Sequence, residues 1–115
     1  MQFTVSLKQN HIFRRLYRTQ GIADSCMVLY TRRNRNGENR VGYTVSKKLG
    51  HAVVRNRVRR RLREVYRLNE SVLAPGYDIV IVARTRAIDT PFSSLVSSFL
   101  TLTEKAGIQC REASP

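Results

Sequence analysis

Residues 41–70 read VGYTVSKKLGHAVVRNRVRRRLREVYRLNE and place a strand directly before a long basic helix. The first six residues alternate, so that Val41, Tyr43 and Val45 share one face and smaller residues share the other, which is typical of a half-buried strand. The small face leaves room for another group to lie on it. From about residue 53 to residue 68 the apolar positions follow a helical period and form one stripe. The stripe consists of Val54, Val58, Leu62, Val65 and Leu68.

The side of this helix opposite the stripe is strongly basic. Residues 47–67 contain nine basic side chains and a single acid, Glu64, which gives the segment a net charge of +8. Like charges four residues apart on a helix repel each other, and Arg55, Arg59 and Arg63 follow one another at that spacing. A merely solvated face would intersperse acids to relieve this repulsion. The pattern therefore favours an anionic partner, with nucleic acid ahead of an acidic membrane or an acidic protein.

The whole chain shares this basic character. Its 115 residues carry 21 Lys and Arg against eight Asp and Glu, so the net charge is +13 at pH 7. The length predicts a single domain, 1–115, with an ordered core at about 6–107 and a short tail at 108–115. The sequence lacks the run of about 18 apolar residues that spans a bilayer, and its N-terminus does not resemble a signal peptide. We expect a cytoplasmic protein with no membrane partner and no small-molecule substrate, in which Cys26 and Cys110 are reduced structural thiols.

Further elements are predicted on both sides of the strand–helix unit. A helix is expected at 10–18, a strand at 26–31, a hairpin loop at 32–40, and a short strand near residues 3–5. The apolar run 77–83 predicts a strand covered on both faces. Thr90 and Pro91 begin a second amphipathic helix that ends near Gly107 and serves packing. Strands and helices mixed in one small domain predict the α+β class.

Aromatic residues lie among the basic ones, which bears on the kind of nucleic acid. Phe13 and Tyr17 are interleaved with arginines, and Tyr30 and Tyr43 lie on predicted strands. Rings beside cations suit the unstacked bases of a single strand, and the sequence carries no helix-turn-helix, zinc-finger or heptad pattern for DNA. Phe13 and Tyr43 fit core positions equally well, whereas the hydroxyls of Tyr17 and Tyr30 oppose burial. The acids are scattered without the pattern of a two-metal nuclease, so we expect any hydrolytic chemistry to come from a partner.

The segment KKLGHAVVRNRVRR, residues 47–60, closely resembles the Arg-Asn-Arg signature of the bacterial ribonuclease P protein subunit family. The strand before it, the residues Ile12, Phe13 and Tyr17, and the segments 28–30 and 78–84 also resemble that family, so the likeness covers about residues 6–106. It implies a single-domain α-β sandwich with a mixed four-stranded sheet and about three helices, a fold shared with a ribosomal protein domain. It also implies that the arginine helix joins two parallel strands through an unusual left-handed crossover.

The same resemblance implies the function. In this family a catalytic RNA removes the 5′ leader of precursor tRNA, Mg²⁺ is held mainly by the RNA partner and the substrate, and the protein supplies no catalytic residue. The expected partners are therefore ribonuclease P RNA and precursor tRNA. The residues implied for leader binding are Phe13, Tyr17, Tyr30, Lys48 and Asn56. Those implied for the catalytic RNA and nearby backbone are Lys47, Arg55, Arg57, Arg59, Arg60, Arg63 and Arg67.

Two alternatives to this function stay open at the level of sequence. A structural RNA-binding protein or RNA chaperone, similar to a ribosomal protein, would bind RNA without affecting cleavage. A protein-only nuclease would cleave precursor tRNA without any RNA subunit. Reconstitution with a bacterial ribonuclease P RNA separates all three.

Overall fold

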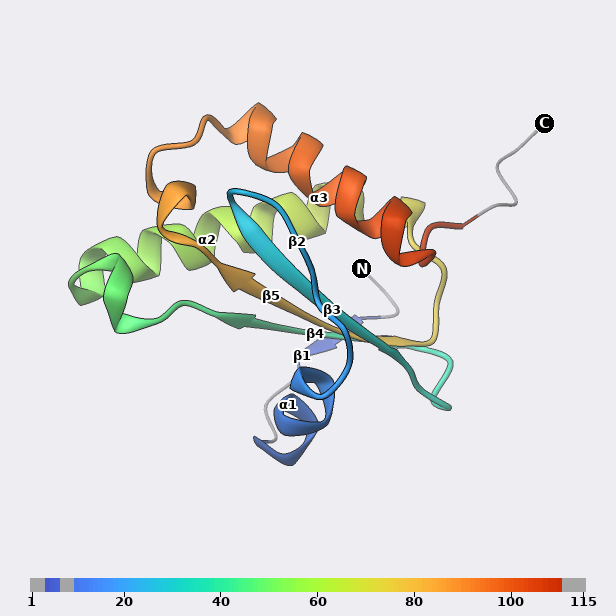
Figure 1. The fold of residues 1–115 in the computed structure, drawn as a ribbon. Helices are drawn as coiled ribbons and strands as arrows, with labels where there is room; N and C mark the ends of the chain where they lie inside the picture. Colours follow the sequence, from blue (N-terminus) through green and yellow to red (C-terminus); the bar gives the residue numbers. More distant parts are fainter. Residues whose placement is uncertain (1–3, 7–9, 111–115) are drawn as a thin grey trace.

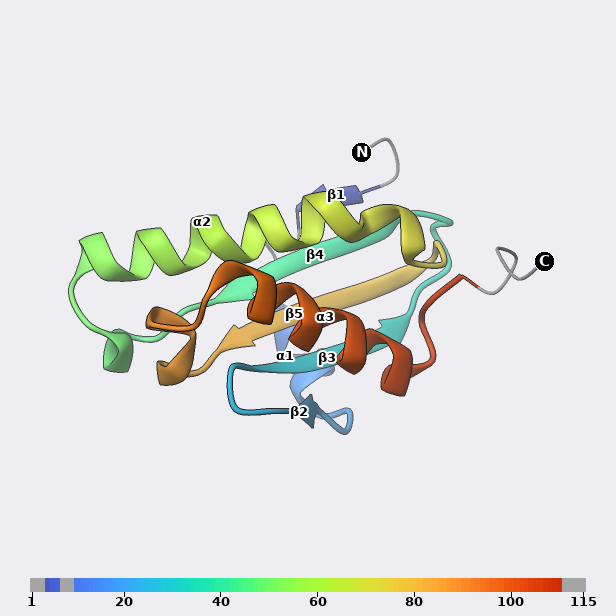
Figure 2. The same cartoon turned by 90° about the horizontal axis from the view of Figure 1, so that it is seen from above.

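The computed structural model, which describes residues 4–6 and 10–110, contains one mixed sheet with helices on both faces (Figures 1 and 2). The strand order is β1-β4-β5-β3-β2, so the last strand of the sequence lies at the centre. β4 is parallel to both β1 and β5, whereas β3 is antiparallel to β5 and β2. The four strands expected from the sequence are present, and the two-residue β2 extends one edge. The strands are β1 (Thr4–Ser6), β2 (Ile22–Ala23), β3 (Met27–Arg33), β4 (Asn39–Thr44) and β5 (Tyr77–Ala83).

Three α-helices cover the two faces of the sheet unequally. Figure 1 shows α1 on one face, and α2 and α3 on the other, where Figure 2 shows them running beside each other. This α+β sandwich confirms the predicted class. The α-helices are α1 (Asn10–Tyr17), α2 (Ala52–Asn69) and α3 (Phe92–Ala106), and the short 3-10 helices are η1 (Lys47–Leu49), η2 (Glu70–Val72) and η3 (Thr85–Ile88).

The strand–helix unit predicted from residues 41–70 forms the β4–α2–β5 connection. α2 begins one residue before the predicted start and ends one residue after the predicted end. Val58, Leu62 and Val65 are buried as expected, but Leu68 is 53% exposed and Tyr66 is buried in its place. α3 explains the difference, because the ring of Phe99 lies edge-on to that of Tyr66 and widens the buried face of α2. The hand of the crossover stays a prediction.

The segment 32–40 does not form the predicted hairpin loop, because β5 lies between β3 and β4. Both strands pair with β5, and the loop between them crosses the beginning of that strand. The backbone N–H of Asn34 donates to the carbonyl oxygen of Gly76 at 2.7 Å. The side-chain oxygen of Asn39 accepts a hydrogen bond from the N–H of Tyr77 at 2.9 Å. The asparagines that resembled turn residues therefore attach the loop to the central strand.

Two apolar clusters hold the layers together, one on each face of the sheet. The larger lies between the sheet and the helices α2 and α3, and it contains Ile79 and Ile81 of β5. The smaller joins Leu16 of α1 to Val80 of β5, with Tyr30 packed beside them. The prediction that β5 is covered on both faces is confirmed.

The C-terminal part of the fold extends further than predicted. α3 begins after Pro91 and ends at Gly107, which takes the left-handed conformation that glycine favours at this position. Ile108 is nevertheless buried in the core, and Gln109 forms a β-bridge with Leu73, so the packed chain continues past the predicted boundary at 107. Cys26 and Cys110 are both free thiols, as expected. None of the described helices is both long and apolar enough to cross a bilayer.

Candidate nucleic-acid interface

The exposed side of α2 carries a pocket of about 320 Å³ whose polar lining comes from a single helix face. The lining residues follow one another at intervals of three, one and three, so the helical period brings them together. The guanidinium of Arg59 donates to the side-chain oxygen of Asn56 at 3.1 Å. None of the described residues that line the pocket is acidic, so the surface attracts anions. We call this surface the α2 pocket; it is lined by Asn56, Arg59, Arg60 and Arg63.

Basic residues also flank the beginning of α2. Lys47 and Lys48 are exposed on η1, and Arg57 is exposed one turn into the helix. Gly50 joins the two helices with a φ of 133°, a conformation that other residues rarely adopt. The first turn of α2 contains no acidic residue, so these cations add to the partial positive charge of the helix N-terminus.

Besides Arg59, three more arginines of α2 are engaged within the protein. Arg61 is half-buried and donates to the carbonyl oxygens of Ala87 at 3.0 Å, Ile88 at 3.4 Å and Thr90, which fixes α2 to the segment before α3. This arginine is structural. Arg55 donates to the carbonyl oxygen of Gly50 at 3.2 Å, and Arg67 forms an ion pair with Glu64. The hydrogen bond from Arg67 lowers the pKa of the Glu64 carboxyl.

A pair of tyrosines lies on the opposite face of the sheet, beside α1. The rings of Tyr17 and Tyr30 meet edge-to-face with centroids 5.1 Å apart. The hydroxyl of Tyr17 is hydrogen-bonded to the hydroxyl of Thr44 at 2.8 Å, and the tyrosine is 42% exposed. A Cβ at Gly21 would lie 2.8 Å from the ring of Tyr30, so the glycine permits the chain to pass close to this ring. The structure thus brings together two of the residues predicted to contact a single strand.

The other predicted leader-binding residues occupy three different places. Phe13 belongs to α1, one turn before Tyr17, and its side chain lies outside the described part of the structure. Lys48 is exposed on η1, four residues after Thr44. Asn56 lines the α2 pocket, where it accepts a hydrogen bond from an arginine.

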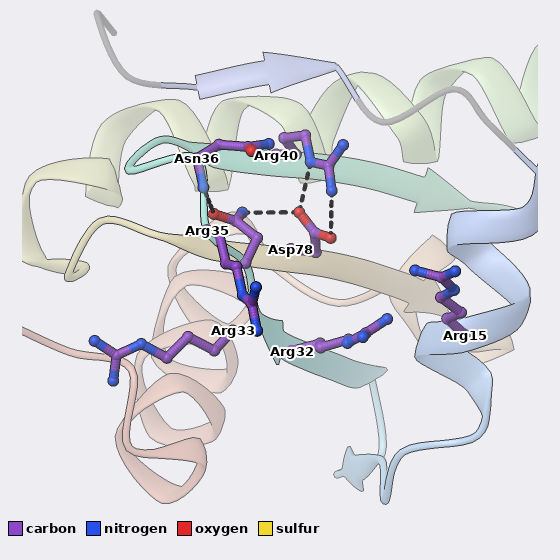
Figure 3. Close-up of a pocket in the computed structure, with 8 residues that line it drawn as sticks. Arg15, Arg32, Arg33, Arg35, Asn36, Arg40 and Asp78 are labelled. Carbon is purple, nitrogen blue, oxygen red and sulfur yellow. Dashed lines mark hydrogen bonds and ion pairs between the residues drawn. The ribbon is translucent and has the colours of Figure 1, made fainter.

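Sequence reasoning missed a second arginine-lined pocket, of about 310 Å³, at the β3–β4 loop (Figure 3). The buried carboxylate of Asp78 lies at its base and accepts two hydrogen bonds of 2.7 Å from Arg40 and one of 2.9 Å from Asn34. The hydrogen bond with Asp78 raises the pKa of Arg40. The available signal is the cluster of arginines at 32–40, which stands among residues typical of a turn. The pocket is lined by Arg15, Arg32, Arg33, Asn34, Arg35, Asn36, Arg40 and Asp78.

Three carboxylates of the described residues are bound to groups of the protein itself. Asp24 accepts hydrogen bonds from the backbone N–H groups of Cys26 and Met27, while Asp78 and Glu64 are paired with arginines. Within residues 4–6 and 10–110, no group of three or more His, Cys, Asp or Glu side chains is placed to hold a metal ion.

The fold and its arginine-lined surfaces define a small basic α+β domain suited to binding polyanions. The ribonuclease P family model matches residues 1–107. The ribonuclease P protein component of Natranaerobius thermophilus is 44% identical, over 92% of this chain and 93% of the relative. That of Clostridioides difficile is 40% identical, over 91% and 94%. The chain belongs to the family of bacterial ribonuclease P protein components.

Solved structures agree with this assignment. The RNase P protein of Staphylococcus aureus superposes with a TM-score of 0.78 at 32% identity, covering 90% of this chain and 95% of that one. The RNase P protein of Thermotoga maritima gives a TM-score of 0.79 at 25% identity, with coverages of 88% and 96%. Membership makes the chain a component of a ribonucleoprotein endoribonuclease and implies a ribonuclease P RNA as its partner.

Proposed function

We propose that this protein binds the catalytic RNA of ribonuclease P and the single-stranded 5′ leader of precursor tRNA, and that it thereby assists Mg²⁺-dependent removal of the leader in the cytoplasm. One observation carries the proposal: the Tyr17–Tyr30 pair and the α2 pocket lie on opposite faces of the sheet. Two separate surfaces allow two RNA segments to be bound at once.

The tyrosine pair supports binding of an unpaired strand. Its partly exposed rings offer a stacking surface to bases of any identity, which suits leaders of varied sequence. We propose that Phe13 and Lys48 complete this surface, and that Asn56, which lines the α2 pocket, contacts the leader apart from the tyrosine pair. Lys48 supplies charge for the phosphates, and Asn56 supplies an amide for hydrogen bonding.

The α2 pocket supports binding of a folded RNA through its phosphates. Planar guanidinium groups match two phosphate oxygens at once, and Arg59, Arg60 and Arg63 present three of them from one helix face. Lys47, Arg55 and Arg57 extend this surface toward the helix start. Arg67 joins it by exchanging Glu64 for a phosphate. These residues form the proposed interface with the catalytic RNA.

The chemistry itself is assigned to the RNA. Asp24, Asp78 and Glu64 bind arginines or backbone N–H groups, and the described residues hold no cluster of metal ligands. We therefore propose that Mg²⁺ is held mainly by the RNA partner and the substrate. The protein positions the RNAs and supplies positive charge.

Reconstitution tests the proposal. Cleavage of 5′-labelled precursor tRNA by a bacterial ribonuclease P RNA is measured at low Mg²⁺, with and without the protein. The protein should raise the cleavage rate and lower the Mg²⁺ requirement. RNA binding with unchanged cleavage would identify a structural RNA-binding protein or chaperone instead. Cleavage by the protein without RNA would identify a protein nuclease.

A matched pair of variants locates the effect. Arg60→Gln/Arg63→Gln removes two charges from the α2 pocket, and Arg86→Gln/Lys105→Gln removes two exposed charges from η3 and α3. Only the first variant should weaken assembly with the catalytic RNA. Equal loss in both would mean that overall charge, and not the α2 pocket, drives binding.

A further inference from the structure

The pocket at the β3–β4 loop lies on the same face of the sheet as the tyrosine pair. Arg32 follows Tyr30 by two residues on β3, so the two side chains leave the same face, roughly 7 Å apart along the strand. The strand register then sets Arg32 beside Asp78, and Asp78 beside Arg40. Arg15 reaches the pocket from α1 (Figure 3). Arg32, Asp78 and Arg40 therefore form a row of charged residues across the sheet, next to the row that contains Tyr30.

Positive charge is concentrated in this pocket beyond what the protein itself balances. Its lining holds five arginines and one carboxylate, Asp78, which leaves a net charge of +4. Arg40 already engages that carboxylate through two hydrogen bonds. In the described part of the chain, the other four arginines form no ion pair. Like charges gathered in a concave surface repel one another, and a bound anion relieves that repulsion.

The loop that carries Arg35, between β3 and β4, is fixed by its own hydrogen bonds. The side chain of Asn34 donates to Asp78 and to the carbonyl oxygen of Glu38, and it accepts a hydrogen bond from the N–H of Asn36. These bonds hold Arg35 beside Asn34 at the rim of the pocket, whereas Arg33, the last residue of β3, extends away from Arg32 and Asp78 (Figure 3). The site is thus formed before any ligand arrives.

We propose that this distal arginine pocket, formed by Arg15, Arg32, Arg33, Arg35 and Arg40, binds backbone phosphates of the leader nucleotides that lie beyond the tyrosine pair. The inference rests on the proposed function and extends the leader-binding surface by a second contact. A strand whose base stacks at Tyr30 continues over the next row of the sheet, where Arg32 and Arg15 lie. The described residues that line the pocket include no aromatic ring, so the pocket contacts phosphates and not bases.

Leader length provides the test. Binding of the reconstituted holoenzyme is measured for precursor tRNAs whose leaders are lengthened one nucleotide at a time. Wild-type affinity should rise once when the leader reaches the tyrosine pair and again when it reaches the distal pocket. Arg32→Gln/Arg35→Gln should lose only the second rise, by roughly three- to tenfold, the scale of two exposed ionic interactions. The salt dependence for long leaders should flatten by about 1.4, at about 0.7 for each phosphate of a single strand that the arginines bind.

The control and the contrary outcomes separate this inference from the proposed function. Arg86→Gln/Lys105→Gln removes the same charge elsewhere and should retain both rises. Unchanged long-leader binding in Arg32→Gln/Arg35→Gln would overturn the distal pocket while the proposed function stands. Equal losses for short and long leaders, or competition by inorganic phosphate that is independent of leader length, would assign the pocket to another anion and overturn it too. A wild-type holoenzyme indifferent to any leader would refute the proposed function itself, and this inference with it.

Discussion

Replacing Arg61 by Met should destabilise the fold, whereas the same change at the neighbouring Arg60 should not. Arg61 donates to the carbonyl oxygens of Ala87, Ile88 and Thr90, and so joins α2 to the segment before α3. Arg60 is exposed and lines the α2 pocket. The two adjacent residues thus separate structural charge from binding charge within one helix.

The magnitude follows from these hydrogen bonds. Hydrogen bonds to charged groups contribute about 1.5–3 kcal/mol each, and Arg61 donates three of them to backbone carbonyl oxygens. Because the side chain is only half-buried, water partly replaces them, and we expect a loss of about 2–3 kcal/mol in the free energy of unfolding. For a domain of this size that loss lowers Tm by roughly 10 °C.

Urea unfolding followed by circular dichroism measures the difference. Arg61→Met should shift the midpoint to lower urea without changing the m-value, since the surface exposed on unfolding stays the same. Arg60→Met should unfold like the wild type but bind RNA more weakly. If the two variants had unfolding free energies within about 0.5 kcal/mol of each other, a spread ordinary for surface substitutions, the structural role assigned to Arg61 would be refuted.

Three further outcomes are expected. Tyr30→Ala should weaken binding of precursor tRNA by about 1–3 kcal/mol, the value of one base–aromatic stack, and that of mature tRNA much less; equal losses in a filter-binding assay would exclude a leader-binding role. Replacing Arg59, Arg60 and Arg63 by Gln should reduce the slope of log K against log salt by roughly 0.7–0.9 for each phosphate that the variant no longer binds, and an unchanged slope would exclude phosphate binding. Burial raises the pKa of Asp24, but hydrogen bonds from Ser98, Cys26 and Met27 outweigh it and lower that pKa below its ordinary value of 3.8. The resulting stability is present above pH 3.8 and lost as the pH falls through the folded-state pKa, so thermal melts of Asp24→Asn should decline less steeply in acid than those of the wild type.

The elements that the sequence predicted well are those with strong local patterns. β5 has the predicted bounds because the five consecutive apolar residues 79–83, with Tyr77 before them, suit a strand covered on both faces. α2 is within one residue at each end because its apolar stripe and its arginines follow the helical period. The predicted hairpin between β3 and β4 is wrong because neighbours in sequence need not be neighbours in a sheet, and β5 separates these two. β2 has two residues, too few to show any period.

The candidate site likewise contains a part that a local sequence pattern predicts and a part that only the fold brings together. The α2 pocket was predictable because its residues share one helix, and the exposed Tyr17 because its hydroxyl opposes burial. The distal arginine pocket draws on α1, β3, the following loop, β4 and β5. Arg32, Asp78 and Arg40 become neighbours only through the register of β3, β5 and β4. That register cannot be predicted from a local sequence pattern.

The central position of β5 bears on how the chain folds during synthesis. β3 and β4 both pair with β5, which follows them by more than thirty residues. Their hydrogen bonds with β5 cannot form until that strand has been synthesised. The ribosome therefore releases the whole arginine helix before the sheet beneath it can close. Pairing of this kind, between distant parts of the chain, slows folding relative to local pairing. The basic surface of α2 therefore has no complete sheet to pack on until residue 83 has left the exit tunnel, and its contacts with the segment before α3 and with Phe99 form later still.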